Sequence, residues 1–133
     1  MSLVWQITKQ WKHLEDIISK LLMDIIKDIN GAKSGKGDDM KPAFHDDATI
    51  FGYIGSDLFS GPIQKLYEWN DKNGPATEIS SEFKSIDVVE SIATVCLESK
   101  NWTGYNFTDF FTLLKVSGQW KIINKLFSNF NIS

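Results

Sequence analysis

The hydrophobic positions between Ile7 and Ile29 recur with alternating spacings of four and three residues. The stripe consists of Ile7, Trp11, Leu14, Ile18, Leu21 and Ile25, and is widened by Ile17, Leu22, Ile26 and Ile29. This period predicts an amphipathic helix of about 20 to 25 residues with a broad buried face. Asn30-Gly31 is a typical helix end. Residues 32–39, with the sequence AKSGKGDD, are expected to form a short flexible linker.

The C-terminal part of the chain has two strand-like runs, which meet at Ser117-Gly118. A two-residue turn there fixes the register and predicts, among others, the pairs Phe111–Asn124 and Asp109–Leu126. One face then carries Phe107, Asp109, Phe111, Leu113, Trp120, Ile122, Asn124 and Leu126, and the other carries Thr108, Phe110, Thr112, Leu114, Lys121, Ile123, Lys125 and Phe127. Because both faces hold large apolar groups, the hairpin is expected either to lie between layers or to close a cavity on one side and an oligomer interface on the other.

Between these segments the pattern changes several times. It predicts a helical turn at 40–44, a strand at 48–53, a helix that Ser60-Gly61-Pro62 opens and Gly74-Pro75 closes, and strands near 78–88 and 92–99. Helices placed ahead of an antiparallel meander indicate an α+β fold, in which a curved antiparallel sheet wraps around the long N-terminal helix. We expect a single domain over residues 1–133, with Met1–Leu3 having the character of an expression scar.

Composition narrows the classes of function. The 14 basic residues are all lysines and stand against 17 acidic residues, for a net charge of −3. Without arginine or a basic stripe, nucleic acid is not an expected partner. No apolar segment reaches the ~20 residues of a membrane span, and no signal peptide is recognisable. The lone Cys96 fits a reducing compartment, so we expect a cytoplasmic protein without membrane partners.

The order of elements resembles that of the nuclear transport factor 2-like superfamily. The resemblance is carried by FHDDAT at 44–49, the SGP helix start and the hairpin FTDFFTLLKVSGQWKIINKLF, and covers nearly all of the chain beyond the first dozen residues. Within the superfamily the chain looks most like the family labelled putative lumazine-binding. The resemblance implies a cone-shaped, cystatin-like α+β fold with an interior pocket, and a homodimer joined through the outer face of the sheet.

The superfamily includes ketosteroid isomerases and SnoaL-like polyketide cyclases, which work without cofactors, so the resemblance implies none here. By alignment with the isomerases, the proton-abstracting aspartate falls on Gly52, whereas the acid of the oxyanion hole falls on Asp109 or Phe111. In the region of the isomerase tyrosine the first helix offers Asp24, Lys27 and Asp28 but no tyrosine. The resemblance therefore does not extend to steroid isomerisation.

Asp109 is the candidate catalytic residue. A carboxyl group on the apolar face of the hairpin should have a raised pKa and could act as a general acid or base, unless a structural hydrogen bond satisfies it. The candidate ligand-binding residues are Tyr53, Trp69, Phe111, Trp120 and Asn124. Large apolar groups such as Trp69 and Trp120 are more often plain core residues, whereas Asn124 is equally consistent with a satisfied core amide. His45 with Asp46 and Asp47 lacks the spacing of a metal-ligand set, so no metal is expected.

Three functions fit these residues. The first is binding of a small apolar or aromatic molecule in an interior pocket. The second is a cofactor-free enzyme, such as an isomerase, cyclase, dehydratase or hydrolase, that uses Asp109. The third is a dimerisation module whose cavity is filled by side chains. The sequence leaves open whether any reaction is catalysed.

Overall fold

The computed structural model describes residues 3–130, with side chains from Lys12 onward. Its two α-helices, two short 3₁₀ turns and six strands follow one another as α1 Leu3–Ser34, η1 Gly37–Asp39, η2 Lys41–Ala43, β1 Phe44–Ile54, β2 Asp57–Pro62, α2 Gln64–Asn73, β3 Ser80–Val89, β4 Ile92–Trp102, β5 Tyr105–Val116 and β6 Gln119–Asn129. The expected α+β class and the helical turn before β1 are confirmed.

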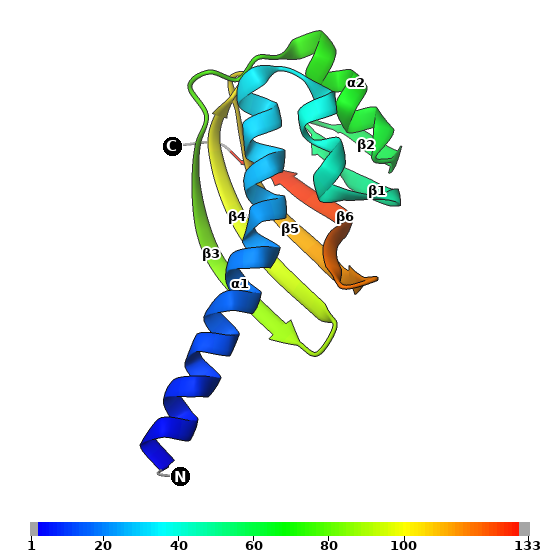
Figure 1. The fold of residues 1–133 in the computed structure, drawn as a ribbon. Helices are drawn as coiled ribbons and strands as arrows, with labels where there is room; N and C mark the ends of the chain where they lie inside the picture. Colours follow the sequence, from blue (N-terminus) through cyan, green and yellow to red (C-terminus); the bar gives the residue numbers. More distant parts are fainter. Residues whose placement is uncertain (1–2, 131–133) are drawn as a thin grey trace.

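The six strands form one curved sheet in the order β2-β1-β6-β5-β4-β3. The β1–β6 pair is parallel, and the four other neighbouring pairs are antiparallel. The α1 helix lies against one face of the sheet, and its N-terminal turns extend beyond the strands (Figure 1). The α2 helix lies at the opposite end, next to the β1–β2 hairpin. This arrangement makes a cone that is closed by α1 and α2, the cystatin-like architecture expected from the sequence.

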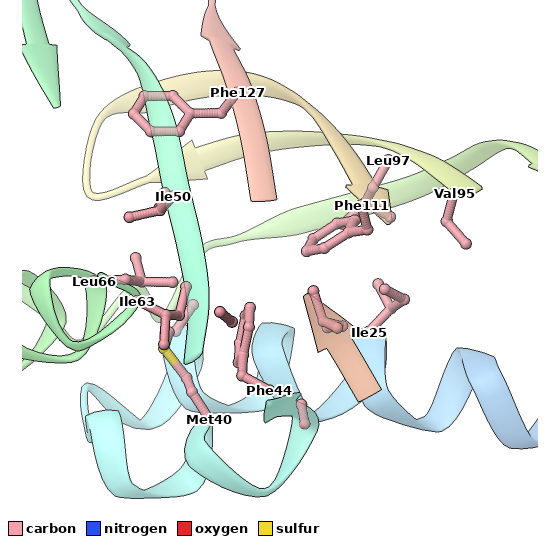
Figure 2. Close-up of a cluster of buried hydrophobic side chains, with 14 of the residues drawn as sticks. Ile25, Met40, Phe44, Ile50, Ile63, Leu66, Val95, Leu97, Phe111 and Phe127 are labelled. Atoms are coloured by element: carbon pink, nitrogen blue, oxygen red, sulfur yellow. The ribbon is translucent and has the colours of Figure 1, made fainter. Parts of the chain in front are cut away.

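The hydrophobic core fills the space between α1 and the concave face of the sheet. Leu21 and Ile25 from α1 are fully buried there, together with Phe111 from β5. Figure 2 shows Ile25, Phe44 and Phe111 directed into the same space, with Ile63 and Leu66 closing it from the side of α2. Each such side chain contributes about 1.5–3 kcal/mol on burial, so the inner stripe of α1 holds the helix on the sheet.

The N-terminal helix is longer than the sequence predicts. It passes through Asn30-Gly31 and ends at Ser34, so much of the expected linker is helical. Gly31 packs so closely on Met40 that a side chain at this position would overlap the Met40 side chain. The residue that follows the helix is Gly35, whose positive φ of 74° is the left-handed conformation that commonly ends helices. Gly31 is therefore a packing glycine, and Gly35 has the terminating role.

The β2 strand was missed. Residues 57–62 pair with β1 in an antiparallel hairpin, in which Ile54 lies opposite Asp57 and Thr49 opposite Pro62. The α2 helix accordingly begins at Gln64, after Pro62, rather than with it. The connection consists of Gly55-Ser56 alone, and Gly55 has a positive φ of 62°. This dipeptide is a hairpin signal, but Pro62 is also typical of the first turn of a helix, which is why the sequence pattern favours a helix start there.

The register of the C-terminal hairpin follows the prediction for only half its length. Pairs run as expected from Val116–Gln119 to Leu113–Ile122, after which a β-bulge inserts one residue at Ile123. Beyond it Phe111 lies opposite Lys125 and Asp109 opposite Phe127, so the predicted pairs Phe111–Asn124 and Asp109–Leu126 are wrong. A one-residue shift exchanges the faces of a strand. Lys125 and Phe127 are therefore buried inside, while Leu126 is exposed on the outer face.

A helix that crosses a membrane needs about 20 mostly apolar residues in succession. Within residues 3–130, neither α1 nor α2 is both long and apolar enough to cross a membrane.

Candidate ligand-binding site

A small cavity lies at the end of the cone where α2 faces the ends of the strands. Its volume is about 30 Å³, enough for a small number of waters. The wall is formed by Ile50, Ile54, Phe59, Leu66, Trp69, Trp102, Phe107, Asp109, Lys125 and Phe127. All but two of these residues are apolar or aromatic, so the site combines an apolar wall with one acidic and one basic group.

The aromatic part of the wall is a connected set of edge-on contacts. The Trp69 ring on α2 meets Trp102 at the end of β4, with ring centroids 6.3 Å apart. Trp102 contacts Phe107 at 5.8 Å, and Phe107 contacts Phe127 at 5.3 Å. Edge-to-face geometry is the preferred arrangement of aromatic pairs and fixes the rings relative to one another. Trp69 is only half-buried, which makes it the most outward member of this set.

Asp109 supplies the acidic group of the cavity. It lies on the inner face of β5 between Phe107 and Phe111 and is 1 % exposed. Neither carboxyl oxygen has a hydrogen-bond partner among the described residues. Burial raises the pKa of Asp109 from 3.8 to about 7; the Lys125 ammonium opposes this rise, and the Asp28 carboxylate adds to it. Near neutral pH the carboxyl group therefore exists in both its protonated and its ionised form.

Lys125 supplies the basic group, held by the first helix. Its Nζ atom donates a hydrogen bond of 2.7 Å to Oδ2 of Asp28 on α1, and both side chains are almost fully buried. The same Nζ atom lies 4.4 Å from the centre of the Trp102 ring and 5.3 Å from that of Phe111. A buried lysine is tolerated only when paired, and contact with the faces of aromatic rings stabilises its charge further.

The residues predicted from the sequence take different places. Asp109 and Trp69 line the cavity. Phe111 and Trp120 are buried in the core without being part of the lining, although Phe111 contacts Lys125.

The other two predicted residues lie away from the cavity. The Tyr53 side chain is 56 % exposed. Asn124 does not share the face of Asp109, because the bulge turns it away, and its amide donates to Oγ1 of Thr49 at 3.0 Å. Their roles in binding stay predictions.

Sequence reasoning missed Lys125 and Asp28 as site residues. The signal for Asp28 was present, because Asp24 and Asp28 fall on the helix stripe of Leu21 and Ile25, at spacings of three and four residues. A carboxylate on an apolar helix face calls for a cationic partner. No such signal marks Lys125 as a site residue, because the regular alternation predicted for the hairpin places its side chain on the outer face of the sheet.

Gly52, the position aligned with the catalytic base of the isomerases, is buried and pairs with Phe127. A side chain at this position would overlap the backbone oxygen and the ring of Phe127. The local packing therefore leaves no room for an acidic or basic side chain at this position, in agreement with the glycine that the alignment with the isomerases places there.

His45, near the start of β1, has a structural partner. The Nδ1 atom of His45 accepts a hydrogen bond of 3.0 Å from the backbone N–H of Asp47. Across the described part of the chain, no group of three or more His, Cys, Asp or Glu side chains is arranged to hold a metal ion.

Comparison with known proteins gives consistent results. A model of the family described as "Putative lumazine-binding" matches residues 19–128. A solved NTF2-like protein of unknown function from Methylobacillus flagellatus is 44 % identical, with a TM-score of 0.84 over 87 % of this chain and 94 % of its own. A second, from Shewanella baltica, is 32 % identical, with a TM-score of 0.82 over 88 % of this chain and 96 % of its own.

A curated relative carries a named activity. The aldolase FrzH from a Cladobotryum species is 26 % identical over 103 residues, which are 77 % of this chain and 82 % of that protein. A ketosteroid isomerase-like protein from Erwinia carotovora is 15 % identical, with a TM-score of 0.63 over 86 % of this chain and 96 % of its own. At that identity the likeness shows the fold alone.

Proposed function

Since the chain belongs to the putative lumazine-binding family of the NTF2-like superfamily, we propose that it binds a small, largely apolar or aromatic molecule in the cavity above Asp109. The observation that carries this proposal is the Asp109 carboxyl group, fully buried and without a hydrogen-bond partner among the described residues. Such a group costs about 1–3 kcal/mol of stability. A ligand with one polar group and an apolar body would offset this cost and suit the aromatic wall.

The size of the cavity sets a condition on binding. A volume of about 30 Å³ is too small for an aromatic ring, so the wall must move to admit one. Trp69 is the candidate for this movement, because it is half-buried and is carried by α2 rather than by the sheet. Rotation of its ring away from Trp102 would open the cavity toward the outside.

The proposal is tested by thermal-shift measurements against a panel of aromatic and heteroaromatic metabolites. A binder should raise the melting temperature of the wild type and lose this effect in Trp69→Ala. The matched control is Phe83→Ala, which removes an exposed aromatic side chain on β3, outside the cavity lining. Equal responses of the two variants, or no response of the wild type to any compound, would contradict the proposed site.

A second candidate function is a cofactor-free enzyme that acts on a carbonyl compound. Two observations favour it: the pKa of Asp109 near 7 suits a general acid or base, and one relative is a named aldolase. If the protein is such an enzyme, Asp109→Asn should abolish turnover and leave binding intact. If the protein only binds its ligand, the wild type should show no turnover, and Asp109→Asn should change the affinity for the ligand.

For the partner, we propose a homodimer through the outer face of the sheet. Phe51, Leu126 and Phe110 are opposite one another on β1, β6 and β5, and each is between 42 % and 54 % exposed. A continuous apolar row across three strands is the kind of surface that a second copy of the chain would cover.

A further inference from the structure

We propose that Lys125 forms a covalent imine with an aldehyde or ketone that enters the cavity. This inference rests on the proposed function, because the carbonyl compound must occupy the same site. It extends that function by naming the reactive class of ligand and the atom that it joins, Nζ of Lys125.

The position of Lys125 separates it from the other lysines. Of the 14 lysines in the chain, it is the one that is buried among those whose side chains the structure describes. It also lines the cavity, which otherwise has apolar walls and Asp109. An ammonium group has three donors, and the hydrogen bond to Asp28 uses one of them. Its other near neighbours are the rings of Trp102 and Phe111, which leave the nitrogen free to bond to a ligand.

Attack on a carbonyl requires the neutral amine, and the pair with Asp28 provides a route to it. Transfer of one proton along the 2.7 Å bond from Nζ to Oδ2 converts the ion pair into an amine and a carboxylic acid. Both products are uncharged, so the transfer leaves no isolated charge in the apolar core. Burial of a lysine in a hydrophobic pocket, away from water, is a recognised means of making its amine nucleophilic.

The covalent step balances with the groups at hand. The lone pair of Nζ forms a bond to the carbonyl carbon while Asp109 gives its proton to the carbonyl oxygen and recovers one from the nitrogen, which yields a carbinolamine. The C–O bond then breaks, and the proton held by Asp28 leaves with the hydroxyl group as water. The product is an iminium, which carries the single positive charge that Lys125 had at the start, opposite an ionised Asp28. No oxidant, reductant or second substrate is consumed.

Asp109 is placed to move protons in this step. It lines the same cavity as Lys125, yet the two side chains form no hydrogen bond or ion pair with each other among the described contacts. A carbonyl group held between them would face the amine on one side and the carboxyl on the other. The Asp109 carboxyl, with both oxygens unengaged, is free to serve that carbonyl oxygen.

The experiment is reductive trapping. The wild-type protein is incubated with benzaldehyde, phenylacetaldehyde or acetone and cyanoborohydride, and the adduct is located by intact-mass and peptide mass spectrometry. We expect labelling of Lys125 at least 10-fold faster than that of Lys121, a lysine of the same strand that lies outside the cavity lining. Lys121→Met should keep the fast adduct and Lys125→Met should lose it. Asp109→Asn should slow trapping about 100-fold without abolishing reversible binding.

The outcomes separate this inference from the proposed function. Thermal stabilisation by a carbonyl compound without any trapped adduct on Lys125 would overturn the imine and leave the binding site standing. Even labelling of surface lysines, without stabilisation by any compound, would overturn both. Should Lys125→Met fail to fold, the uncharged double variant Asp28→Leu/Lys125→Met supplies the same test, and an undiminished fast adduct in it would refute the assignment.

Discussion

The Lys125 ammonium on β6 lies 2.7 Å from the Asp28 carboxylate on α1, inside the apolar core. This ion pair joins the first helix to the centre of the sheet and at the same time fixes the lysine at the edge of the cavity. It shows why an acidic residue occurs on the buried stripe of α1, where an apolar side chain would pack more easily. That residue, Asp28, is the counter-ion of the only buried lysine among the described side chains.

Removing the lysine should destabilise the protein strongly. The Lys125→Met variant leaves Asp28 buried without its partner, and such a change costs about 3–5 kcal/mol. The free energy of unfolding, measured by urea denaturation, should fall by that amount. The control is Lys20→Met, which breaks the exposed α1 pair with Asp16 and should cost about 0.5 kcal/mol or less. The ion pair lacks its structural role if the two variants lose equal stability.

The double variant Asp28→Leu/Lys125→Met should regain most of this stability. It replaces both charges by apolar groups, so no unpaired charge remains in the core, and such replacements are often neutral or stabilising. A double variant no more stable than Lys125→Met would show that the pair is not the source of the loss. With the single variant Asp28→Leu measured beside them, the four unfolding free energies give the coupling between the two residues directly.

Stability should decline as the pH rises from about 4 to 7. Because the pKa of Asp109 is raised from 3.8 to about 7 by burial, the folded protein keeps this proton at pH values where the unfolded chain has lost it. The contribution is fully present below pH 4 and is lost as the pH passes 7, a difference on the order of 4 kcal/mol. The measurement is the free energy of unfolding at pH 5 and pH 8, between which about 3 kcal/mol of this difference should be lost.

The Asp109→Asn variant isolates this dependence. Lys125 and Asp28, which face Asp109 in the wild type, are kept in the variant, and so is Asp24, whose pKa burial raises to about 6. The difference between the two pH profiles therefore belongs to Asp109. Parallel profiles for the wild type and the variant would contradict the burial of an unpartnered carboxyl group at Asp109.

Asn124→Ala should affect stability rather than binding. The Asn124 amide donates to Oγ1 of Thr49 at 3.0 Å, away from the cavity, so its loss should cost about 1 kcal/mol and leave ligand affinity unchanged. Urea denaturation and titration with a ligand found in the thermal-shift panel measure the two effects. Weaker binding at unchanged stability would favour the regular register, in which Asn124 points inward.

The proposed dimer should dissociate when its apolar row receives a charge. Phe110→Lys places an ammonium group in the centre of the row, and we expect the dimer dissociation constant to rise at least about 100-fold, equivalent to about 2.7 kcal/mol. Analytical ultracentrifugation measures it. The control, Val89→Lys, changes an exposed side chain at the end of the edge strand β3. A wild-type monomer, or equal weakening by both variants, would contradict this interface.

The sequence predicted the class of fold because its strongest signals are local. The stripe of α1 and the Ser117-Gly118 turn each determine one element from residues close together in the chain. Errors arose where tertiary packing decides. Gly31 is held inside the helix by close contact with Met40, and β2 exists because it pairs with β1.

The candidate site was predictable only in part for the same reason. Asp109 and Trp69 line the cavity as the patterns of their own segments suggested. Lys125 was assigned to the wrong face because a single bulge residue, Ile123, reverses the alternation of β6, and nothing in the residue types of this strand marks a bulge. The pair of Lys125 with Asp28 spans 97 positions of sequence, a separation that no local pattern encodes.

The most direct test of ligand binding is native mass spectrometry of the gently purified protein, with Trp69→Ala measured beside it and any released compound identified after denaturation. We predict that the wild type carries a stoichiometric small molecule with an apolar or aromatic body, and that the variant has lost it. A wild type that carries no compound, and takes up none from the aromatic and carbonyl panels, would contradict ligand binding in this cavity and favour a dimerisation module with a filled cavity.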